Sequence, residues 1–450
     1  MKTRSYRILA CILLATFVFS LAACAPAATS APTVPPAATN VPTAPPASTL
    51  KGDLSVLIMK DNPGQDVPTQ EQIMAWGKAN NVNVTVEVST LTNLSVKDAT
   101  IIQSGTGADV FIIQGYGPQL YADSLLDLTD VAEEIGNADG GFYDIAKQLG
   151  MVNGTWKAIP VYIYMHQIIY RIDMLKAIGE PVPDTWDDLL RVSKELEAKF
   201  GPSGTDAIGV PYGRSSDGSQ FTQAVLWGYG SKMFSDDGKK VTFDSPETVT
   251  GLKYVVDLYN QNVTPKGVMA WDDSSNNQAF LANQIAMTAN GSSIKVQAKT
   301  VSQELYDNTG IAVMPKGPAG RFSFPNPFSF AVRKNTQNPE AAKSLLRYLF
   351  DKKNYGDLIT VTGGAIGSSL KGFESLPVWN TPDTKAMLDA IPTARLTGWP
   401  AAPSKVSADV DSARIVIDMV GRVINDKLTP EQAVTEAAGK IQQILDADSK

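Results

Sequence analysis

Residues 25–49 form a proline- and alanine-rich segment that separates the first 24 residues from the part of the chain that is expected to fold. Seven of these 25 residues are proline, eight are alanine and none is charged. Such a segment cannot build a core, and proline-rich backbone stays extended at about 3.1 Å per residue. The 400 residues from Lys51 onward exceed what one hydrophobic core usually organises. We therefore expect a tether that carries a folded body of two lobes.

The segment ahead of the tether has the pattern of a bacterial lipoprotein leader. Basic residues open it, an apolar run over residues 8–21 follows, and the run ends in Leu21-Ala22-Ala23-Cys24. The run is 14 residues long, shorter than the roughly 20 that a membrane-spanning helix needs. We expect residues 1–23 to be a signal peptide, Cys24 to be lipidated, and residues 24–50 to link it to the body. The protein is then anchored extracytoplasmically, on the outer face of the cell membrane.

Charge and cysteine content narrow the possible partners. Without the leader the chain has 36 basic and 46 acidic residues, a net charge of −10. A nucleic-acid partner would require a basic face, so we expect none. The second cysteine, Cys11, lies within the leader, which leaves the mature chain no pair for a disulfide.

Strand and helix patterns alternate along the folded part. Valine occupies every second position from Val82 to Val88, which predicts a half-buried strand, and residues 109–114 form an apolar run typical of a buried one. Helix starts are indicated where a hydroxyl precedes a carboxylate or amide by three residues, as in Thr69–Gln72, Thr185–Asp188 and Thr429–Gln432. Asp237-Gly238 predicts a hairpin turn. Interleaved strands and helices favour an α/β architecture.

The sequence lacks the residues that most catalytic mechanisms need. His166 is the single histidine, and we expect it to be packed or hydrogen-bonded. A zinc site lacks its usual ligands and no phosphate-binding glycine loop is present, so we expect no metal and no cofactor. A glycoside hydrolase needs only two carboxyl groups, and Asp272-Asp273 beside Trp271 is the pair that could supply one. That enzyme remains the alternative from another class.

Three motifs follow one another in the chain: Gly-Thr-Trp-Lys-Ala-Ile-Pro at 154–160, Tyr-Arg-Ile-Asp-Met-Leu at 170–175, and Ile-Gly-Glu-Pro-Val-Pro-Asp-Thr-Trp-Asp-Asp-Leu at 178–189. In this order and spacing they resemble one family, the extracellular solute-binding proteins, family 1, of ABC sugar importers. The resemblance runs from about Leu54 to the end of the chain and is strongest over residues 154–160, 170–175 and 178–189. Residues 107–110, 311–315, 328–335 and 338–343 are also similar to the family. Two places differ: Ser292-Ser293 stands where many members have an aromatic residue, and residues 365–367 replace a proline-containing loop.

The resemblance implies a type II periplasmic-binding-protein fold, with two α/β lobes, a hinge and a ligand cleft between them. Lobe 1 would comprise residues 51–160 and 328–362, and lobe 2 residues 161–327 and 363–450. The protein would not be an enzyme. It would be a monomer that captures a mono- or oligosaccharide by hinge closure and delivers it to the membrane subunits of an ABC permease. A non-sugar solute such as a polyamine or a peptide is the alternative ligand.

Aromatic residues are the first candidates for sugar contacts, because sugars present apolar C–H faces that pack on rings. Three tryptophans lie in loop-like stretches, and we expect them to stack on the ligand: Trp227 before Gly228, Trp271 before Asp272-Asp273, and Trp399 between Gly398 and Pro400. Polar contacts are expected from Asp272, Asp273, Tyr116, Tyr162 and Asn290. Trp186, at a helix start, is instead expected in the core.

The leader yields the first testable prediction. If Cys24 carries the lipid, Cys24→Ser abolishes lipid labelling and releases the protein from the membrane fraction. The melting temperature of the body stays unchanged, because the tether is not part of its core. A mutant that is unlabelled yet still retained in the membrane fraction would contradict the assignment.

Overall fold

The computed structural model of the protein describes residues 50–60 and 64–448. The predicted signal peptide, Cys24 and the linker up to residue 49 lie outside the described residues. Within the described ranges, no helix is both long enough and apolar enough to cross a bilayer.

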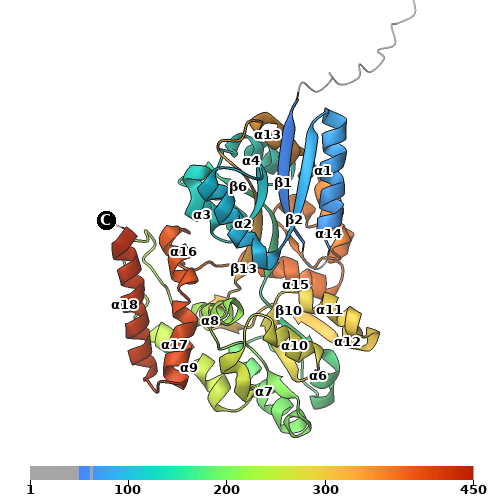
Figure 1. Cartoon of the computed structure of the whole chain (residues 1–450). Helices are drawn as coiled ribbons and strands as arrows, with labels where there is room; N and C mark the ends of the chain where they lie inside the picture. The colour runs from blue at the N-terminus through green and yellow to red at the C-terminus, as the bar shows by residue number, and fades with distance from the viewer. Residues whose placement is uncertain (1–49, 61–63, 449–450) are drawn as a thin grey trace, which may run out of the picture. The chain divides into compact units, whose positions relative to one another are not determined.

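The first lobe is built on a six-stranded sheet with the order β14-β6-β13-β3-β1-β2. Strands β1, β2 and β3 are mutually parallel, whereas β13 runs antiparallel between β3 and β6. Helix α1 lies beside β1 and β2 (Figure 1). The lobe contains β1 (Asp53–Lys60), α1 (Asp66–Asn80), β2 (Asn83–Thr90), α2 (Leu91–Ser104), β3 (Val110–Gln114), α3 (Gly117–Tyr121), η1 (Ala122–Ser124), α4 (Thr129–Ala138), α5 (Asp144–Gly150), β4 (Met151–Val152), β5 (Thr155–Trp156), β6 (Ala158–Met165), β13 (Pro325–Val332), α13 (Pro339–Leu349), α14 (Lys352–Val361), β14 (Gly367–Ser368), η4 (Lys371–Phe373) and η5 (Pro377–Trp379).

The second lobe is built on a four-stranded sheet with the order β10-β7-β9-β8. Helices α17 and α18 pack against each other at the C-terminal end of the chain (Figure 1). The lobe contains β7 (Gln167–Arg171), α6 (Ile172–Ile178), α7 (Trp186–Phe200), η2 (Gly201–Ser203), β8 (Asp206–Ile208), α8 (Ser216–Gly228), α9 (Pro246–Asn260), η3 (Lys266–Ala270), α10 (Ser275–Leu281), β9 (Ile285–Asn290), α11 (Ser293–Val301), α12 (Gln303–Asp307), β10 (Thr309–Ala312), β11 (Lys316–Gly317), β12 (Gly320–Arg321), α16 (Lys405–Ser412), α17 (Ile415–Ile424) and α18 (Pro430–Asp448). The α/β class expected from the sequence is confirmed.

The chain passes between the lobes in segments that are hydrogen-bonded to one another. His166 joins β6 to β7, and its N–H donates to Phe324 O at 3.0 Å. Ser323 N–H donates to Thr393 O at 3.2 Å, and Arg395 N–H donates to Ser323 O at 3.0 Å. The last of these segments follows α15 (Pro382–Ala390) and η6 (Ile391–Thr393). We call these paired segments the crossing.

The lobe boundaries predicted at 160/161, 327/328 and 362/363 differ from the boundaries that the two sheets define. Strand β6 stays in the six-stranded sheet through Met165, β13 joins that sheet from Pro325, and β14 pairs with β6 at Gly367. The physical reason is that β6 and β13 pair along their whole length, so both strands leave the sheet together at the crossing.

Each lobe has its own apolar core. Trp76, Trp156 and Trp379 are buried in the core of lobe 1. Trp186 is buried in the core of lobe 2, and its ring meets Phe221 edge-on at 5.8 Å. The core position expected for Trp186 is thus confirmed.

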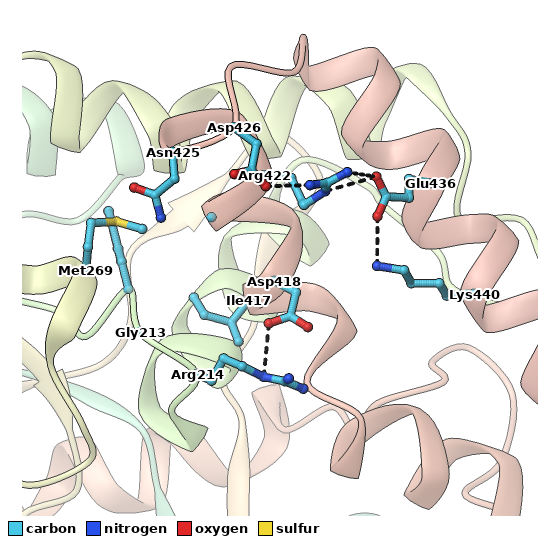
Figure 2. Close-up of a pocket in the computed structure, with 12 residues that line it drawn as sticks. Gly213, Arg214, Met269, Ile417, Asp418, Arg422, Asn425, Asp426, Glu436 and Lys440 are labelled. Carbon is cyan, nitrogen blue, oxygen red and sulfur yellow. Dashed lines mark hydrogen bonds and ion pairs between the residues drawn. The ribbon is translucent and has the colours of Figure 1, made fainter.

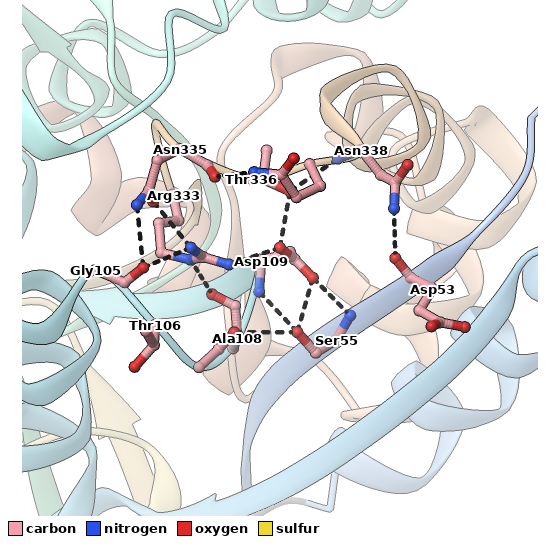
Figure 3. Close-up of polar contacts among 12 residues, drawn as sticks. Asp53, Ser55, Gly105, Thr106, Ala108, Asp109, Arg333, Asn335, Thr336 and Asn338 are labelled. Atoms are coloured by element: carbon pink, nitrogen blue, oxygen red, sulfur yellow. Dashed lines mark hydrogen bonds and ion pairs between the residues drawn. The ribbon is translucent and has the colours of Figure 1, made fainter.

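A partly buried carboxylate ties the strands of lobe 1 to the loop that follows β13 (Figure 3). Asp109 accepts hydrogen bonds from the backbone and side chain of Ser55, from the Thr336 hydroxyl and from the Arg333 guanidinium, all at 2.8 to 3.0 Å. Burial alone would raise the pKa of Asp109, but these hydrogen bonds and the Arg333 charge outweigh it and lower the pKa below the usual value. The charged form therefore fixes β1, β3 and β13 relative to one another.

Candidate ligand-binding cleft

Two adjoining cavities with volumes of about 400 and 330 Å³ open between the lobes. Both are lined by Gln114 and Asn326 of lobe 1 and by Ser216 and Gln220 of lobe 2. Because they share these walls, we treat them as one site and call it the cleft. Pockets of this size, between two lobes, are typical of small-molecule sites.

The lobe 2 wall is formed by the first turn of α8. Ser215 caps the helix by accepting from Gly218 N–H at 3.0 Å, which leaves Ser216, Asp217 and Gln220 facing the cleft. A carboxylate in a first turn is favoured by the helix dipole. The α8 N-terminus therefore positions an acid and an amide together.

Asp217 is the centre of a polar network at this wall. Its Oδ2 accepts from Asn290 Nδ2 at 2.8 Å and from Asn276 Nδ2 at 3.2 Å, and His166 Nε2 lies 3.5 Å from its Oδ1. Its backbone N–H donates to Asp273 Oδ1 at 2.8 Å. Desolvation of the Asp273 carboxyl group and the negative charge of the neighbouring Asp217 raise the pKa of Asp273. The network holds the side chains that face the ligand in defined positions.

The lobe 1 wall combines amides with aromatic rings. Gln114, at the end of β3, donates through Nε2 to Asn326 Oδ1 near the start of β13 at 2.9 Å. The Tyr164 and Phe328 rings line the same cavity and meet edge-on at 5.8 Å. The wall therefore offers both an apolar face and hydrogen-bonding amides.

A second set of charged groups lies at the other end of the cleft. Arg414 contacts the Asp411 carboxylate at 3.3 Å and donates to the Ser216 hydroxyl at 2.5 Å. Burial raises the pKa of Asp411 although Arg414 and the Thr397 hydroxyl oppose the shift. Burial and the Asp411 charge also raise the pKa of Tyr116.

Asp98 on α2 differs from the other acids of the cleft. It is 3% exposed, its Oδ1 has no hydrogen-bond partner, and burial raises its pKa to about 8. Asp98 is thus mostly protonated near neutral pH, and its carboxyl group can donate as well as accept.

The cleft brings together some of the residues expected from the sequence. Tyr116 lines the 330 Å³ cavity, and Asp273 and Asn290 line the 400 Å³ cavity. His166 is 5% exposed and lies 3.5 Å from the Asp217 carboxylate, in agreement with the packed or hydrogen-bonded position expected for it.

The three candidate stacking tryptophans do not line the cleft. Trp227 is not in a loop, because α8 continues through Gly228; the ring is 4% exposed and stacks on Phe324 at 6.0 Å. Trp271 is half-buried, and its ring lies against the Gly209 backbone between apolar clusters of lobe 2. Trp399 packs on Phe322 at 5.6 Å and lines a different cavity.

Two polar candidates also lie elsewhere. Tyr162 is 1% exposed and packs against Phe328 at 5.3 Å, one layer behind the cleft wall. Asp272 is exposed and lies just ahead of α10, where its Oδ1 accepts hydrogen bonds from the hydroxyls of Ser274 and Ser275 at 2.8 Å. These side-chain and backbone bonds lower its pKa.

The residues that sequence reasoning missed are mostly amides. Gln114, Gln220, Asn277, Gln297 and Asn326 all line the cleft. They come from separate elements and share no local motif, so only the fold brings them together. The one available signal was the position of Gln114 at the end of a predicted buried strand.

A further cavity of about 550 Å³ lies within lobe 2, between η3, α17 and α18 (Figure 2). Its charged side chains are paired with one another: Arg214 with Asp418, Arg422 with Asp426 and Glu436, and Lys440 with Glu436. Because these ion pairs already satisfy its charges, this cavity is a weaker candidate for ligand capture than the cleft. Among the described residues, no group of three or more His, Cys, Asp or Glu side chains could hold a metal ion.

Two α/β lobes joined by a hydrogen-bonded crossing, with a polar cleft between them, define the class of two-lobe solute-binding proteins. The family model for bacterial extracellular solute-binding proteins matches residues 62–356, so the chain belongs to that family. This is a family of binding proteins and not of enzymes, as expected from the sequence.

Individual relatives are distant. YcjN of Escherichia coli (strain K12), named as an ABC transporter periplasmic-binding protein, is 23% identical over 371 residues, which cover 78% of this chain and 83% of that protein. An ABC transporter solute-binding protein from Thermotoga lettingae, bound with α-D-tagatose, superposes with a TM-score of 0.76 at 20% identity, covering 88% of this chain and all of that one. The sugar-binding protein MalE from Xanthomonas citri gives 0.75 at 19% identity, covering 88% and 98%. These structures confirm the two-lobe fold.

The raised pKa of Asp98 yields a pH-dependent prediction. Between about pH 4 and pH 8 the folded state keeps a proton that the unfolded chain releases, so folding stability falls as the pH rises through this range. Asp98→Asn removes this penalty. We expect the variant to match the wild type near pH 4 and to exceed it at pH 8 by on the order of 1–3 kcal/mol in the free energy of unfolding.

Asp127→Asn is the control of opposite sign. Hydrogen bonds from Thr129 outweigh desolvation and lower the pKa of Asp127, so this variant loses stability at neutral pH relative to the wild type. Denaturant titrations across the pH range measure the free energy of unfolding of both variants and of the wild type. A constant difference between Asp98→Asn and wild type at all pH values would exclude the buried, protonated carboxyl.

Proposed function

We propose that this protein is the extracytoplasmic binding protein of an ABC importer, that it captures a neutral mono- or oligosaccharide in the cleft, and that it presents the sugar to the permease. In this proposal it acts as a monomer, held at the membrane by the lipid on Cys24. The observation that carries the proposal is the composition of the cleft: amides from both lobes surround an aromatic wall.

Amide side chains suit a sugar because each can both donate and accept a hydrogen bond, as a sugar hydroxyl does. Gln220 Oε1 has no partner although the residue is 8% exposed, so an acceptor is already placed for a ligand hydroxyl. The rings of Tyr164 and Phe328 supply the apolar surface that a sugar's C–H face requires. Tagatose in the Thermotoga lettingae protein and the sugar-binding role named for the Xanthomonas citri protein support the same ligand class.

The mechanism follows from the position of the polar groups. Gln114 and Asn326 belong to lobe 1, whereas Gln220, Asp217 and Asn290 belong to lobe 2. A ligand that contacts both sets of residues at the same time stabilises the closed arrangement of the lobes. Ligand binding therefore increases the population of the closed form. The permease would then recognise the closed form.

A polyamine is the second candidate ligand, and the carboxyl groups of the cleft favour it. Asp98, Asp217, Asp273 and Asp411 line the cleft, opposed by the single arginine Arg414. Three of them, however, already bind Asn290, the α8 backbone or Arg414, and Asp98 is mostly protonated near neutral pH. These hydrogen bonds occupy carboxylate oxygens that an ammonium group would need, so a sugar fits better.

We predict that a thermal-shift screen against sugars, polyols, polyamines and short peptides identifies a sugar as the stabilising class. A ligand at 100 times its dissociation constant stabilises the folded state by about 2.7 kcal/mol. Gln220→Ala and Gln114→Ala should each weaken binding of that sugar by on the order of 1–3 kcal/mol in calorimetry, because each removes a hydrogen bond from one lobe.

Gln442→Ala is the matched control, since Gln442 is exposed on α18 and hydrogen-bonds only with Asp446 among the described side chains. It should bind the sugar as the wild type does. Stabilisation by polyamines and not by sugars would replace the sugar proposal with the polyamine one. Unchanged sugar affinity in both cleft variants would place the site elsewhere.

A further inference from the structure

A separate cavity of about 760 Å³ adjoins the crossing. One wall is Tyr143 and the start of helix α5 of lobe 1, including Asp144, and the opposite wall belongs to lobe 2, including Asp236 and Trp399. The segment from Ile391 to Arg395 lies between these walls. We call this space the Arg395 cavity.

The Arg395 cavity and the cleft lie on different faces of the same segment. Arg395 lines the former, and its neighbour Leu396 lines the latter. The segment is fixed at this point by the isolated β-bridge between Ala394 and Ser323 and by the hydrogen bond from Arg395 N–H to Ser323 O at 3.0 Å. A ligand in this cavity would therefore be distinct from the ligand of the cleft.

The Arg395 guanidinium is held in place without a counter-charge. It lies 5.1 Å from the centre of the Phe322 ring and 5.7 Å from that of the Trp399 ring. Its Nη1 donates to Ala394 O at 2.7 Å, while the buried Nε has no hydrogen-bond partner. Burial lowers the pKa of Arg395, in keeping with a cation that lacks an anion.

Arg395 is an exception among the arginines that the structure describes. Among the described residues it is the arginine without an ion pair, whereas the others each contact a carboxylate: Arg171, Arg191, Arg214, Arg321, Arg333, Arg347, Arg414 and Arg422. A partly buried guanidinium with unused donors presents the planar fork that binds carboxylate or phosphate oxygens in pairs.

The rest of the lining limits the size and charge of the ligand. Lys371 at the rim has its ammonium 6.0 Å from the Tyr143 ring and forms no ion pair among the described residues. The acids of the rim, Asp144 and Asp236, are exposed, and Asp144 is already paired with Lys147. The two cationic side chains can bind a small anion, whereas the two acidic side chains beside them would repel a long polyanion.

We propose that the Arg395 cavity is a second ligand site, which binds a small dianion through carboxylate or phosphoryl oxygens held by Arg395 and Lys371. The Phe322 and Trp399 rings, whose centres lie 5.6 Å from each other, support the guanidinium from one side.

Calorimetric titration of the protein with succinate and with inorganic phosphate, at constant ionic strength and with sodium chloride as the blank, tests this site. We expect saturable binding of at least one dianion, weakened at least tenfold in Arg395→Gln. Arg395→Lys should also weaken it, because a lysine keeps the charge but loses the fork. Which dianion binds more tightly distinguishes a dicarboxylate from a phosphoryl ligand.

Arg214→Gln is the control, since Arg214 lies in lobe 2 away from this cavity and is paired with Asp418. It should bind the dianion as the wild type does. Because Lys371 is exposed, Lys371→Gln keeps the test valid if Arg395→Gln fails to fold, and it should also weaken binding. A wild-type dissociation constant above about 10 mM for both dianions, or equal affinity in wild type and the folded Arg395 variants, would overturn the site.

Discussion

The backbone hydrogen bonds of the crossing are the constraint on which the rest of this structure depends. His166 pairs with Phe324, and Ser323 pairs with Thr393 and Arg395, so the segments that connect the lobes run together. Each lobe keeps its own sheet, and Ala408 of α16 packs against the core of lobe 1. Two lobes that are connected by a few paired segments can change their angle by hinge motion while each sheet stays intact.

The same constraint separates two environments. On one face the crossing contributes Leu396 and Phe324 to a cleft in which Asp411 is paired with Arg414 and Asp217 is hydrogen-bonded to Asn290. On another it contributes Arg395, whose charge has no partner among the described residues. A neutral ligand suits the first because it exchanges hydrogen bonds with water without desolvating a net charge. An anion suits the second because a half-buried guanidinium gains most from a charged acceptor.

Local patterns in the sequence predicted local structure well. Thr185 accepts from Asp188 N–H, Thr429 and Gln432 form a reciprocal cap, and a turn at Asp237-Gly238 joins the paired residues Phe234 and Val241. Thr69 failed as a cap because α1 begins at Asp66, which places its hydroxyl inside the helix, where it bonds Gln65 O.

The errors in the candidate site have a different cause. Gly228 suggested that Trp227 lies in a loop, yet that glycine ends a helix where any side chain would strike Trp186. Gly228 therefore allows close packing against Trp186 and does not mark a loop. The cleft amides escaped notice because Gln114, Gln220 and Asn326 lie far apart in the sequence, and an isolated amide has no pattern until the fold places it beside others. The family resemblance predicted the lobes, but it carried no information on which side chains line this cleft.

The central claim is that sugar binding in the cleft brings the lobes together about the crossing. Val96 on α2 of lobe 1 and Val301 on α11 of lobe 2 are both exposed, and these helices also contribute Leu91 and Gln297 to opposite walls of the cleft. With Cys24→Ser as the background, spin labels at Val96→Cys and Val301→Cys report the distance between the lobes by pulsed electron paramagnetic resonance. The account predicts that a saturating sugar shifts the distance distribution to shorter values and narrows it. An unchanged distribution, with calorimetry showing the sugar bound, would contradict closure of the lobes.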